Sequence, residues 1–261
     1  MKVLVIGNGW IGNEIIQILR KKKINVQSTY REKKKLNLPK DKQIKFKSLF
    51  NKKIINQFEI VIYTVWYTNP KNYLVSRKNI EHKKMIINIA KNYSNPIGRF
   101  IGLGSCLEYY LNNNENYLTT KSSTKPNTLY GICKLRSYVS LKNIFQKKKI
   151  KFIWCRIFFL FDKDKNSKEQ KGRLIPVIKS KIKQRKTFLI ENPNFIRDYL
   201  PIKKAARMIV NEALNKKKGI VNICSGKGIS IMSLVKSIFG KNKYIIFSNK
   251  QNQSQFIVGK R

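Results

Sequence analysis

Three glycines near the start of the chain constrain its fold more than any other feature. They lie in residues 5–12 (VIGNGWIG), directly after the apolar run Val3–Ile6 and before helical spacing over Asn13–Lys22. A strand, a glycine-rich turn and a helix in this order predict a βαβ unit that binds a pyrophosphate.

Each glycine has a separate physical task in such a turn. Gly7 permits the tight turn, Gly9 lets backbone N–H groups approach phosphate, and Gly12 lets the helix pack closely on the strand. The helix N-terminus adds positive potential. We therefore expect a nicotinamide dinucleotide at the turn, bound by Gly7, Asn8, Gly9, Trp10, Ile11 and Gly12.

Apolar runs then alternate with amphipathic stretches over the first 160 residues. The predicted strands are Val3–Ile6, Ile24–Tyr30, Ile60–Val65, Phe100–Leu103 and Phe152–Phe158. The predicted helices are Asn13–Lys22, Ile80–Ala90 and Tyr130–Phe145. This alternation predicts an α/β fold, a doubly wound parallel sheet (Rossmann) with helices on both faces, for a dinucleotide-binding domain over 1–160.

The pattern loosens after residue 160. A polar loop over Asp162–Lys171 precedes further predicted helices and strands, which are Leu174–Ile182, Phe188–Ile190, Pro201–Leu214, Ile220–Ile223 and Ser230–Phe239. No linker marks a clean break. Residues 161–261 are therefore expected to form a smaller C-terminal α/β substrate-binding lobe, interleaved with the sheet domain.

A formal net charge of +43 would attract nucleic acid or anionic membrane surfaces. However, 45 of the 56 basic residues are Lys, they are spread over the whole chain, and no nucleic-acid-binding module accompanies them. The charge is typical of a compositional bias, so no specific nucleic-acid partner is expected.

Other residue counts exclude further classes of protein. No run of about 18 apolar residues predicts a membrane span, and the first apolar run is too short for a secretory signal, so a cytoplasmic protein is expected. The four cysteines lack C-x-x-C spacing. They are expected to be reduced, mostly buried thiols, with no metal site.

The end of the second predicted strand bears on the choice of dinucleotide. An acidic residue there would bind the ribose hydroxyls of NAD. This chain instead has Ser28-Thr29-Tyr30-Arg31, followed by Glu32. A guanidinium at Arg31 suits a 2′-phosphate, which favours NADP, and Glu32 keeps NAD as the alternative.

A Y-x-x-x-K pattern begins the predicted helix Tyr130–Phe145. Tyr130 and Lys134 are spaced i, i+4, so they share one face of the helix. An ammonium beside a phenol lowers the phenol pKa toward neutrality, as a general acid or base for carbonyl chemistry requires. Ser105 follows the strand Phe100–Leu103, where its hydroxyl could bind the reacting oxygen.

With Ser105, Tyr130 and Lys134 after a glycine-rich turn, the chain resembles an extended short-chain dehydrogenase/reductase of the NAD-dependent epimerase/dehydratase family, whose members modify nucleotide sugars. The resemblance covers nearly the whole length. Besides the glycine-rich turn, it rests on Ile60–Trp66, Asn69-Pro70, Asn79, residues 104–109 (GSCLEY), 129–135, 156–158 and 173–176, Arg197-Asp198-Tyr199, and 221–226 (VNICSG).

The resemblance implies a role for each matching position. Tyr130 would be the catalytic acid or base, Lys134 its partner and a ribose ligand, and Ser105 the ligand of the substrate oxygen. Val65 would line the cofactor. Substrate would contact Ser105, Phe159, Arg173 and Arg197, the two arginines holding its diphosphate.

Departures from the family pattern narrow the reaction type. Dehydratases of the family carry acidic residues just after the catalytic Ser, where this chain has Cys106 and Leu107. Glu108 follows, and we expect it on the wrong side of the strand end. The leading hypothesis is therefore NADP-dependent reduction of a 4-keto-6-deoxyhexose nucleotide for surface polysaccharide.

Two alternatives stay open. One is an NAD-dependent 4-epimerase, and the other, from a different class, is a non-catalytic RNA-binding or scaffold relative of the fold. The resemblance also implies acidic residues after Arg197-Asp198-Tyr199 and a longer chain. Because this chain has Pro201–Lys204 there and ends at Arg261, we expect either a short subfamily or a truncated copy with an incomplete substrate pocket.

Three remaining predictions concern single side chains and assembly. His82, the only histidine, is expected to be solvated on a polar helix face. Trp66 and Tyr67 either line the substrate pocket or belong to the core. A homodimer would use the helices Ile80–Ala90 and Tyr130–Phe145, because relatives often pair through four helices.

Overall fold

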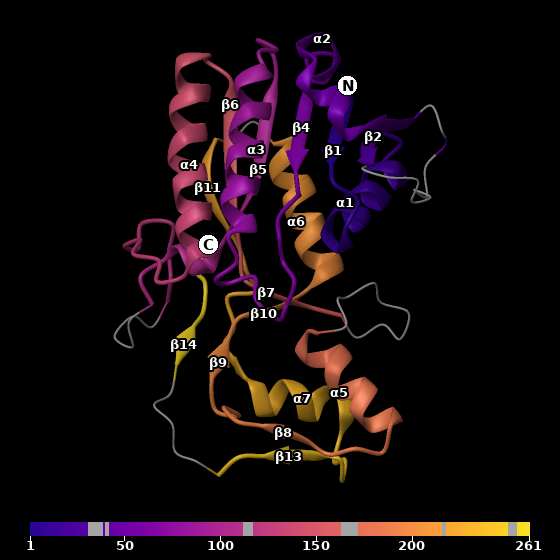
Figure 1. Cartoon of the computed structure of the whole chain (residues 1–261), viewed down its shortest axis with the longest axis vertical. Coiled ribbons are helices and arrows are strands. Elements are labelled where there is room, and N and C mark those ends of the chain that lie inside the picture. The colour runs from indigo at the N-terminus through magenta and orange to yellow at the C-terminus, as the bar shows by residue number, and fades with distance from the viewer. Residues whose placement is uncertain (31–38, 40–41, 112–116, 163–171, 216–217, 250–254) are drawn as a thin grey trace.

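Seven parallel strands organise the larger half of the molecule (Figure 1). The computed structural model describes residues 1–30, 39, 42–111, 117–162, 172–215, 218–249 and 255–261. Within these residues the sheet order is β11-β6-β5-β4-β1-β2-β3. Its strands are β1 (Lys2–Ile6), β2 (Asn25–Tyr30), β3 (Gln43–Lys45), β4 (Ile60–Tyr63), β5 (Arg99–Ser105), β6 (Lys151–Ile157) and β11 (Gly219–Ile223).

The sheet is buried on both faces, as its nearly continuous aliphatic strands require. In β1, Val3 and Val5 enter one hydrophobic core, and Leu4 and Ile6 enter the other. Successive side chains of a strand point to opposite faces, so one apolar run supplies both cores.

Two pairs of helices cover these faces. Helices α1 (Trp10–Lys21) and α6 (Ile202–Leu214) pack on the side of Val3 and Val5. Helices α3 (Lys78–Asn92) and α4 (Leu129–Lys147) lie side by side over the other face, as Figure 1 shows. Short elements η2 (Phe46–Phe50) and α2 (Lys52–Ile55) complete this second layer.

The smaller lobe lies below the sheet in Figure 1. Its core joins Ile178, Ile190 and Val235. The lobe contains α5 (Leu174–Lys183), β8 (Phe188–Ile190), β9 (Ile196–Arg197), β12 (Ile229–Ser230), α7 (Ile231–Phe239), β13 (Ile245–Phe247) and β14 (Phe256–Ile257). Strands β7 (Phe159–Phe161) and β10 (Tyr199–Pro201) pair between the sheet and the lobe.

The chain passes between the two halves more than once. Helix α6 and strand β11 follow residue 160 in sequence, yet both belong to the sheet half. Division at residue 160 therefore does not separate the sheet from the lobe.

The register places three strand ends together at one edge of the sheet. Ile6 pairs with Tyr63, and Tyr63 pairs with Gly102. Since β1 has β2 on one side and β4 on the other, the winding direction changes here, which creates a crevice at the carboxyl ends.

The predicted fold class is confirmed, and each strand and helix named above for the sheet half forms with small shifts at its ends. All four cysteines are free and buried, as expected. The prediction for His82 is wrong. Its side chain is only 8% exposed and stacks on Trp66, with 6.3 Å between ring centroids, because this face of α3 turns toward the sheet.

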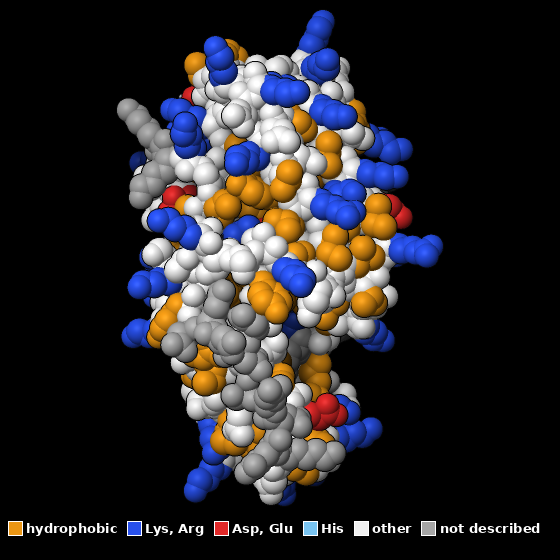
Figure 2. All heavy atoms as spheres, turned by 90° about the vertical axis from the view of Figure 1, so that its left-hand side faces the viewer, with side chains coloured by type: hydrophobic (Ala, Val, Ile, Leu, Met, Phe, Trp, Pro, Cys, Tyr) orange, Lys and Arg blue, Asp and Glu red, His pale blue; other side chains and the backbone are white. Residues whose placement is uncertain are grey.

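The surface carries the charge expected from composition. Figure 2 shows Lys and Arg side chains scattered along the whole length of one face, with hydrophobic side chains between them. Among the described helices none is long and apolar enough to cross a membrane.

Candidate functional site

A cavity of about 720 Å³ lies at the carboxyl edge of the sheet. It collects residues from the turn after β1, the end of β2, the loop after β4, the end of β5 and the start of α4. The predicted site residues that line it are Gly7, Asn8, Gly9, Trp10, Ile11, Val65, Ser105, Tyr130, Lys134, Phe159 and Arg173.

The glycine-rich turn has the close approaches that its sequence predicts. Gly7 has a φ of +100°, which favours glycine, and an added Cβ would lie 2.7 Å from the Thr64 hydroxyl oxygen. Gly12 does not line the cavity. Its missing Cβ instead lets α1 pack against Gly7, whose carbonyl oxygen would be 2.2 Å from such an atom.

The beginning of α1 fits a phosphate group. Gly9 caps the helix without a side-chain hydrogen bond, and the first turn holds no acidic residue. The N–H groups of Trp10, Ile11 and Gly12 have no partner within the helix, as at every helix start. A Cβ built on Gly9 would meet nothing within 4 Å. Open space beside backbone N–H groups that have no partner within the helix suits a dinucleotide pyrophosphate.

The end of β2 contributes neutral groups. The Thr29 hydroxyl accepts a hydrogen bond from the Gly7 N–H, and Thr29 and Tyr30 both line the cavity. Arg31, on which the NADP prediction rests, lies outside the described residues, as does Glu32.

Local capping and one glycine bring Tyr130 to the cavity. The Thr128 side chain caps α4 by accepting a hydrogen bond from the Gly131 N–H. A Cβ on Gly131 would lie 2.3 Å from the Leu107 carbonyl oxygen, so only glycine allows this approach. The first turn of α4 thus rests against the turn that follows Ser105.

The surroundings of Tyr130 hold it in the protonated form. Burial raises the pKa of its phenol, the neighbouring Tyr73 raises it further, and Arg173 opposes them. The i, i+4 spacing predicts that Lys134 lowers this pKa. Burial outweighs the opposing charge of Arg173, so the phenol pKa lies above its ordinary value, and the effect of Lys134 on it stays a prediction.

Lys134 is itself directed at other groups. Its ammonium donates a hydrogen bond to the Leu103 carbonyl oxygen at 2.5 Å and lies 3.8 Å from the centroid of the Trp66 ring. The Tyr130 ring centroid is 5.4 Å away. Burial holds the pKa of Lys134 well below its ordinary value, and Glu108 acts in the opposite direction. Trp66 therefore lines the cavity and supports the lysine by a cation–π contact.

Ser105 ends β5 and begins the short helix η3 (Cys106–Glu108). Its hydroxyl accepts a hydrogen bond from the Leu107 N–H at 3.2 Å. An oxygen that already accepts one hydrogen bond can offer its own O–H to a substrate oxygen. The position thus suits the predicted task.

Tyr73 is a cavity residue that the sequence analysis missed. Its ring lies edge-on to Tyr130, with 5.1 Å between centroids, and burial raises its pKa too. The tyrosine stands in an irregular segment after Asn69-Pro70, where periodicity carries no signal. Tyr67, by contrast, does not line the cavity, and its hydroxyl bonds to Asn72.

The two arginines assigned to substrate lie in different surroundings. Arg173 lines the cavity, with its guanidinium 5.0 Å from the centroid of the Trp10 ring. Arg197 does not line it. The Arg197 guanidinium is buried between Phe159 and Phe195 and bonds to the backbone and side chain of Gln255.

The two positions after Ser105, at which dehydratases carry acidic residues, hold no acidic side chain in this cavity. Cys106 and Leu107 line it, and burial raises the pKa of the Cys106 thiol to about 12. Glu108 does not line the cavity, and its buried carboxylate accepts a hydrogen bond from Trp154 Nε1. The described residues also contain no group of three or more His, Cys, Asp or Glu able to hold a metal ion.

Comparison with known proteins agrees with this architecture. The sequence model of the NAD dependent epimerase/dehydratase family matches residues 3–224. Among curated proteins, no sequence matches the chain.

Solved structures with the same fold include several enzymes of known name. A UDP-glucose 4-epimerase from Thermotoga maritima, solved with UDP-glucose, has a TM-score of 0.78 at 16% identity, covering 99% of this chain and 89% of its own. A UDP-N-acetylglucosamine 4-epimerase from Bacillus cereus gives 0.79 at 17% identity, with 98% and 86% covered. A dTDP-glucose 4,6-dehydratase from Bacillus anthracis, solved with NAD, gives 0.77 at 15% identity, with 99% and 87% covered.

Proposed function

The chain belongs to the NAD dependent epimerase/dehydratase family, and from this premise we propose that it is an oxidoreductase that reduces the 4-keto group of a nucleotide-linked 6-deoxyhexose. One observation carries the proposal. Ser105, Tyr130 and Lys134 line the same cavity as the phosphate-binding turn, so a sugar carbonyl and a dinucleotide can meet there.

The side chains divide the work of the reduction. The bound nicotinamide dinucleotide would supply the hydride to the carbonyl carbon. Tyr130, whose raised pKa keeps it protonated at neutral pH, would donate the proton that the new alkoxide oxygen needs. Ser105 would hold that oxygen by a hydrogen bond, and Lys134 would offer its ammonium near the phenol.

Arg173 is the proposed ligand of the substrate diphosphate within the cavity. Its planar guanidinium suits phosphate oxygens, and α5 brings it from the lobe to the glycine-rich turn. Phe159 would contact the same substrate, since it lines the cavity beside the lobe. Arg197 could hold the substrate diphosphate, as the resemblance implies, only if its hydrogen bonds to Gln255 broke.

A 4-epimerase is the second candidate, because several structures of the same fold are named as 4-epimerases. An epimerase would oxidise and re-reduce the same carbon through the same residues. The two reactions differ in whether the dinucleotide is consumed.

The decisive assay follows nicotinamide absorbance with a panel of nucleotide-linked 4-keto-6-deoxyhexoses. Consumption of the reduced dinucleotide, lowered about 10²–10⁴-fold by Tyr130→Phe, is the expected result. Interconversion of 4-epimers without net consumption would establish the epimerase instead. Inertness toward all these substrates, with salt-sensitive RNA binding that survives Tyr130→Phe, would favour the non-catalytic alternative.

The choice between dinucleotides is a separate proposal. Arg31 favours NADP, whereas several structures of the same fold were solved with NAD. If NADP is the cofactor, Arg31→Ala should lower NADP affinity about tenfold or more and leave NAD affinity unchanged. Equal loss for both dinucleotides would refute a 2′-phosphate contact.

We also propose a homodimer through α3 and α4, which lie side by side on one face. Val139 on α4 is 49% exposed and would lie within such an interface. Val139→Glu should therefore shift the protein from dimer to monomer by sedimentation. A monomeric wild type would refute the proposal.

A further inference from the structure

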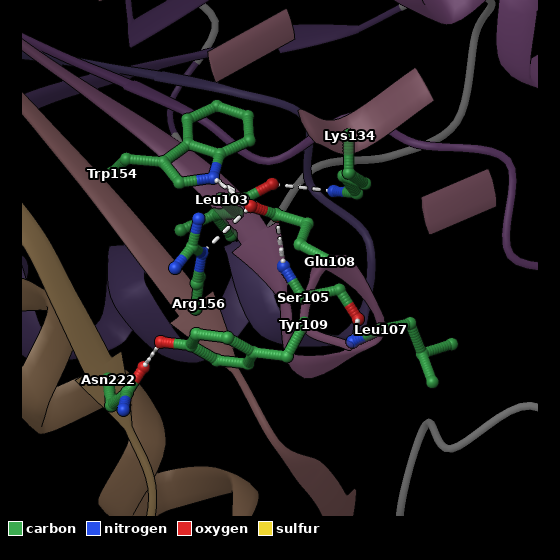
Figure 3. A network of polar contacts seen from close by, with 9 residues as sticks. All are labelled: Leu103, Ser105, Leu107, Glu108, Tyr109, Lys134, Trp154, Arg156 and Asn222. Carbon is green, nitrogen blue, oxygen red and sulfur yellow. Dashed lines mark hydrogen bonds and ion pairs between the residues drawn. The ribbon is translucent and has the colours of Figure 1, made fainter. Parts of the chain in front are cut away.

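Glu108 is a fully buried carboxylate next to the cavity, and three donors surround it (Figure 3). The Ser105 backbone N–H donates to it at 2.7 Å, Trp154 Nε1 at 3.0 Å and Arg156 Nε at 2.9 Å. Arg156 is itself only 2% exposed. Burying such a pair costs desolvation free energy that apolar residues of similar size would avoid.

The carboxylate and Ser105 form a reciprocal capping box around η3. Glu108 accepts a hydrogen bond from the Ser105 N–H, and the Ser105 hydroxyl accepts one from the Leu107 N–H. Glu108 thus fixes the backbone of Ser105, the residue whose hydroxyl would face the substrate. Each half of the box limits the rotation of the other.

Two glycines of β5 leave the space that this carboxylate and the Trp154 indole occupy. A Cβ on Gly104 would lie 2.4 Å from Glu108 Oε1 and 2.3 Å from Trp154 Nε1. Gly102 similarly makes space for the indole, which a Cβ would approach to 2.4 Å. The two glycines of β5 and the carboxylate are therefore one structural unit.

The far side of the network is also tied down. The Arg156 guanidinium lies 4.4 Å from the centroid of the Tyr109 ring, and the Tyr109 hydroxyl donates to Asn222 Oδ1 at 2.7 Å. Asn222 donates in turn to the carbonyl oxygens of Leu118 and Lys260. Glu108 cannot shift without disturbing this chain of contacts (Figure 3).

We propose that Glu108 is a positioning residue for the reduction: through the Ser105 N–H it holds the Ser105 hydroxyl where the substrate oxygen binds. This inference rests on the proposed function. The carboxylate touches no substrate, since it does not line the cavity. A charge paired with Arg156 holds the amide more strongly than a neutral acceptor would.

The test is a double-mutant cycle between Glu108→Gln and Ser105→Ala. Because a small misplacement of a reacting group costs up to about 10²-fold, Glu108→Gln should lower kcat about 10–100-fold with Ser105 present. In the Ser105→Ala background the same change should lower kcat less than about twofold. KM and dinucleotide affinity should stay within about twofold in both backgrounds.

Tyr93→Phe is the matched control for a purely structural effect. The Tyr93 hydroxyl is buried and donates to the Phe58 carbonyl oxygen at 2.9 Å, at the opposite edge of the sheet. Its loss should lower the melting temperature and leave kcat unchanged. If Glu108→Gln does not fold, Glu108→Asp retains the charge beside Arg156 and should show the same coupling with a smaller loss.

Amide hydrogen exchange separates this inference from the proposed function. Exchange at the amides of Ser105 and Leu107 should accelerate about tenfold in Glu108→Gln and not in Tyr93→Phe. This measurement needs no substrate, so it does not depend on the reaction that the protein catalyses. With an active wild type, equal kcat losses in both Ser105 backgrounds would overturn the inference. With a wild type inert toward the whole panel, the proposed function fails, and unchanged exchange at both amides would overturn the positioning role of Glu108 as well.

Discussion

The carboxyl edge of the sheet and the C-terminal lobe present their polar residues in opposite ways. At the sheet edge, strands of up to seven residues run in parallel register and end together, so Ser105 and the glycine-rich turn face an open cavity. In the lobe, strands are two or three residues long. There Arg197 and Asp198 bind the protein's own backbone.

Arg197 and Asp198 illustrate the second arrangement. Arg197 bonds to the Gln255 backbone, and the buried Asp198 carboxylate accepts hydrogen bonds from the N–H groups of Ser225, Gly226 and Gly259. Short strands bury too little surface to hold themselves, so side chains take the place of ladder hydrogen bonds. These two charged residues therefore have structural tasks that their sequence motif does not reveal.

The largest expected effect comes from the sheet edge. Gly12→Ala would force its Cβ against the Gly7 carbonyl oxygen, and since that oxygen belongs to the backbone the turn must move. We expect a loss of about 3 kcal/mol in the free energy of unfolding together with loss of dinucleotide binding. Chemical denaturation and calorimetric titration measure the two effects.

Gly9→Ala is the matched control within the same turn. Gly9 has a φ of −65° and open space where a Cβ would stand. Stability should change by less than about 1 kcal/mol, whereas dinucleotide affinity should fall because the methyl group enters the cavity. Unchanged affinity in Gly9→Ala would place the dinucleotide away from this turn.

The next largest effect should come from the lobe. Asp198→Ala leaves three N–H groups without their buried acceptor, at a cost of about 2–3 kcal/mol. Limited proteolysis should then cut the lobe first, while the sheet half keeps its hydrogen-exchange protection. Glu191→Ala, an exposed carboxylate in the same lobe, should have no measurable effect. Equal loosening of both halves would show that Asp198 does not stabilise the lobe in particular.

The smallest effect distinguishes the two arginines. Arg173→Ala should raise KM for the nucleotide sugar about tenfold, as the loss of a charge-assisted hydrogen bond implies, with little change in melting temperature. Arg197→Ala should do the reverse, because its contacts are internal. A larger KM effect at Arg197 would mean that substrate displaces Gln255.

Much of the sheet half was predictable from the sequence, because its segments are long, apolar and separated by glycine or capping residues. Val3–Ile6 and the three glycines specify their strand and turn through local sterics. The lobe was harder. Strands such as Ile196–Arg197 and Phe256–Ile257 are too short to show a period, and their pairing joins residues about 60 positions apart.

The sequence by itself determined the parallel α/β fold, the phosphate-binding turn and the identity of Ser105, Tyr130 and Lys134 as candidates. Only the tertiary structure decided what surrounds each of them. Burial raises the pKa of Tyr130, the Lys134 ammonium lies over the Trp66 ring, and Arg197 bonds to Gln255. These outcomes depend on desolvation and on contacts between distant segments, which spacing along a chain does not encode.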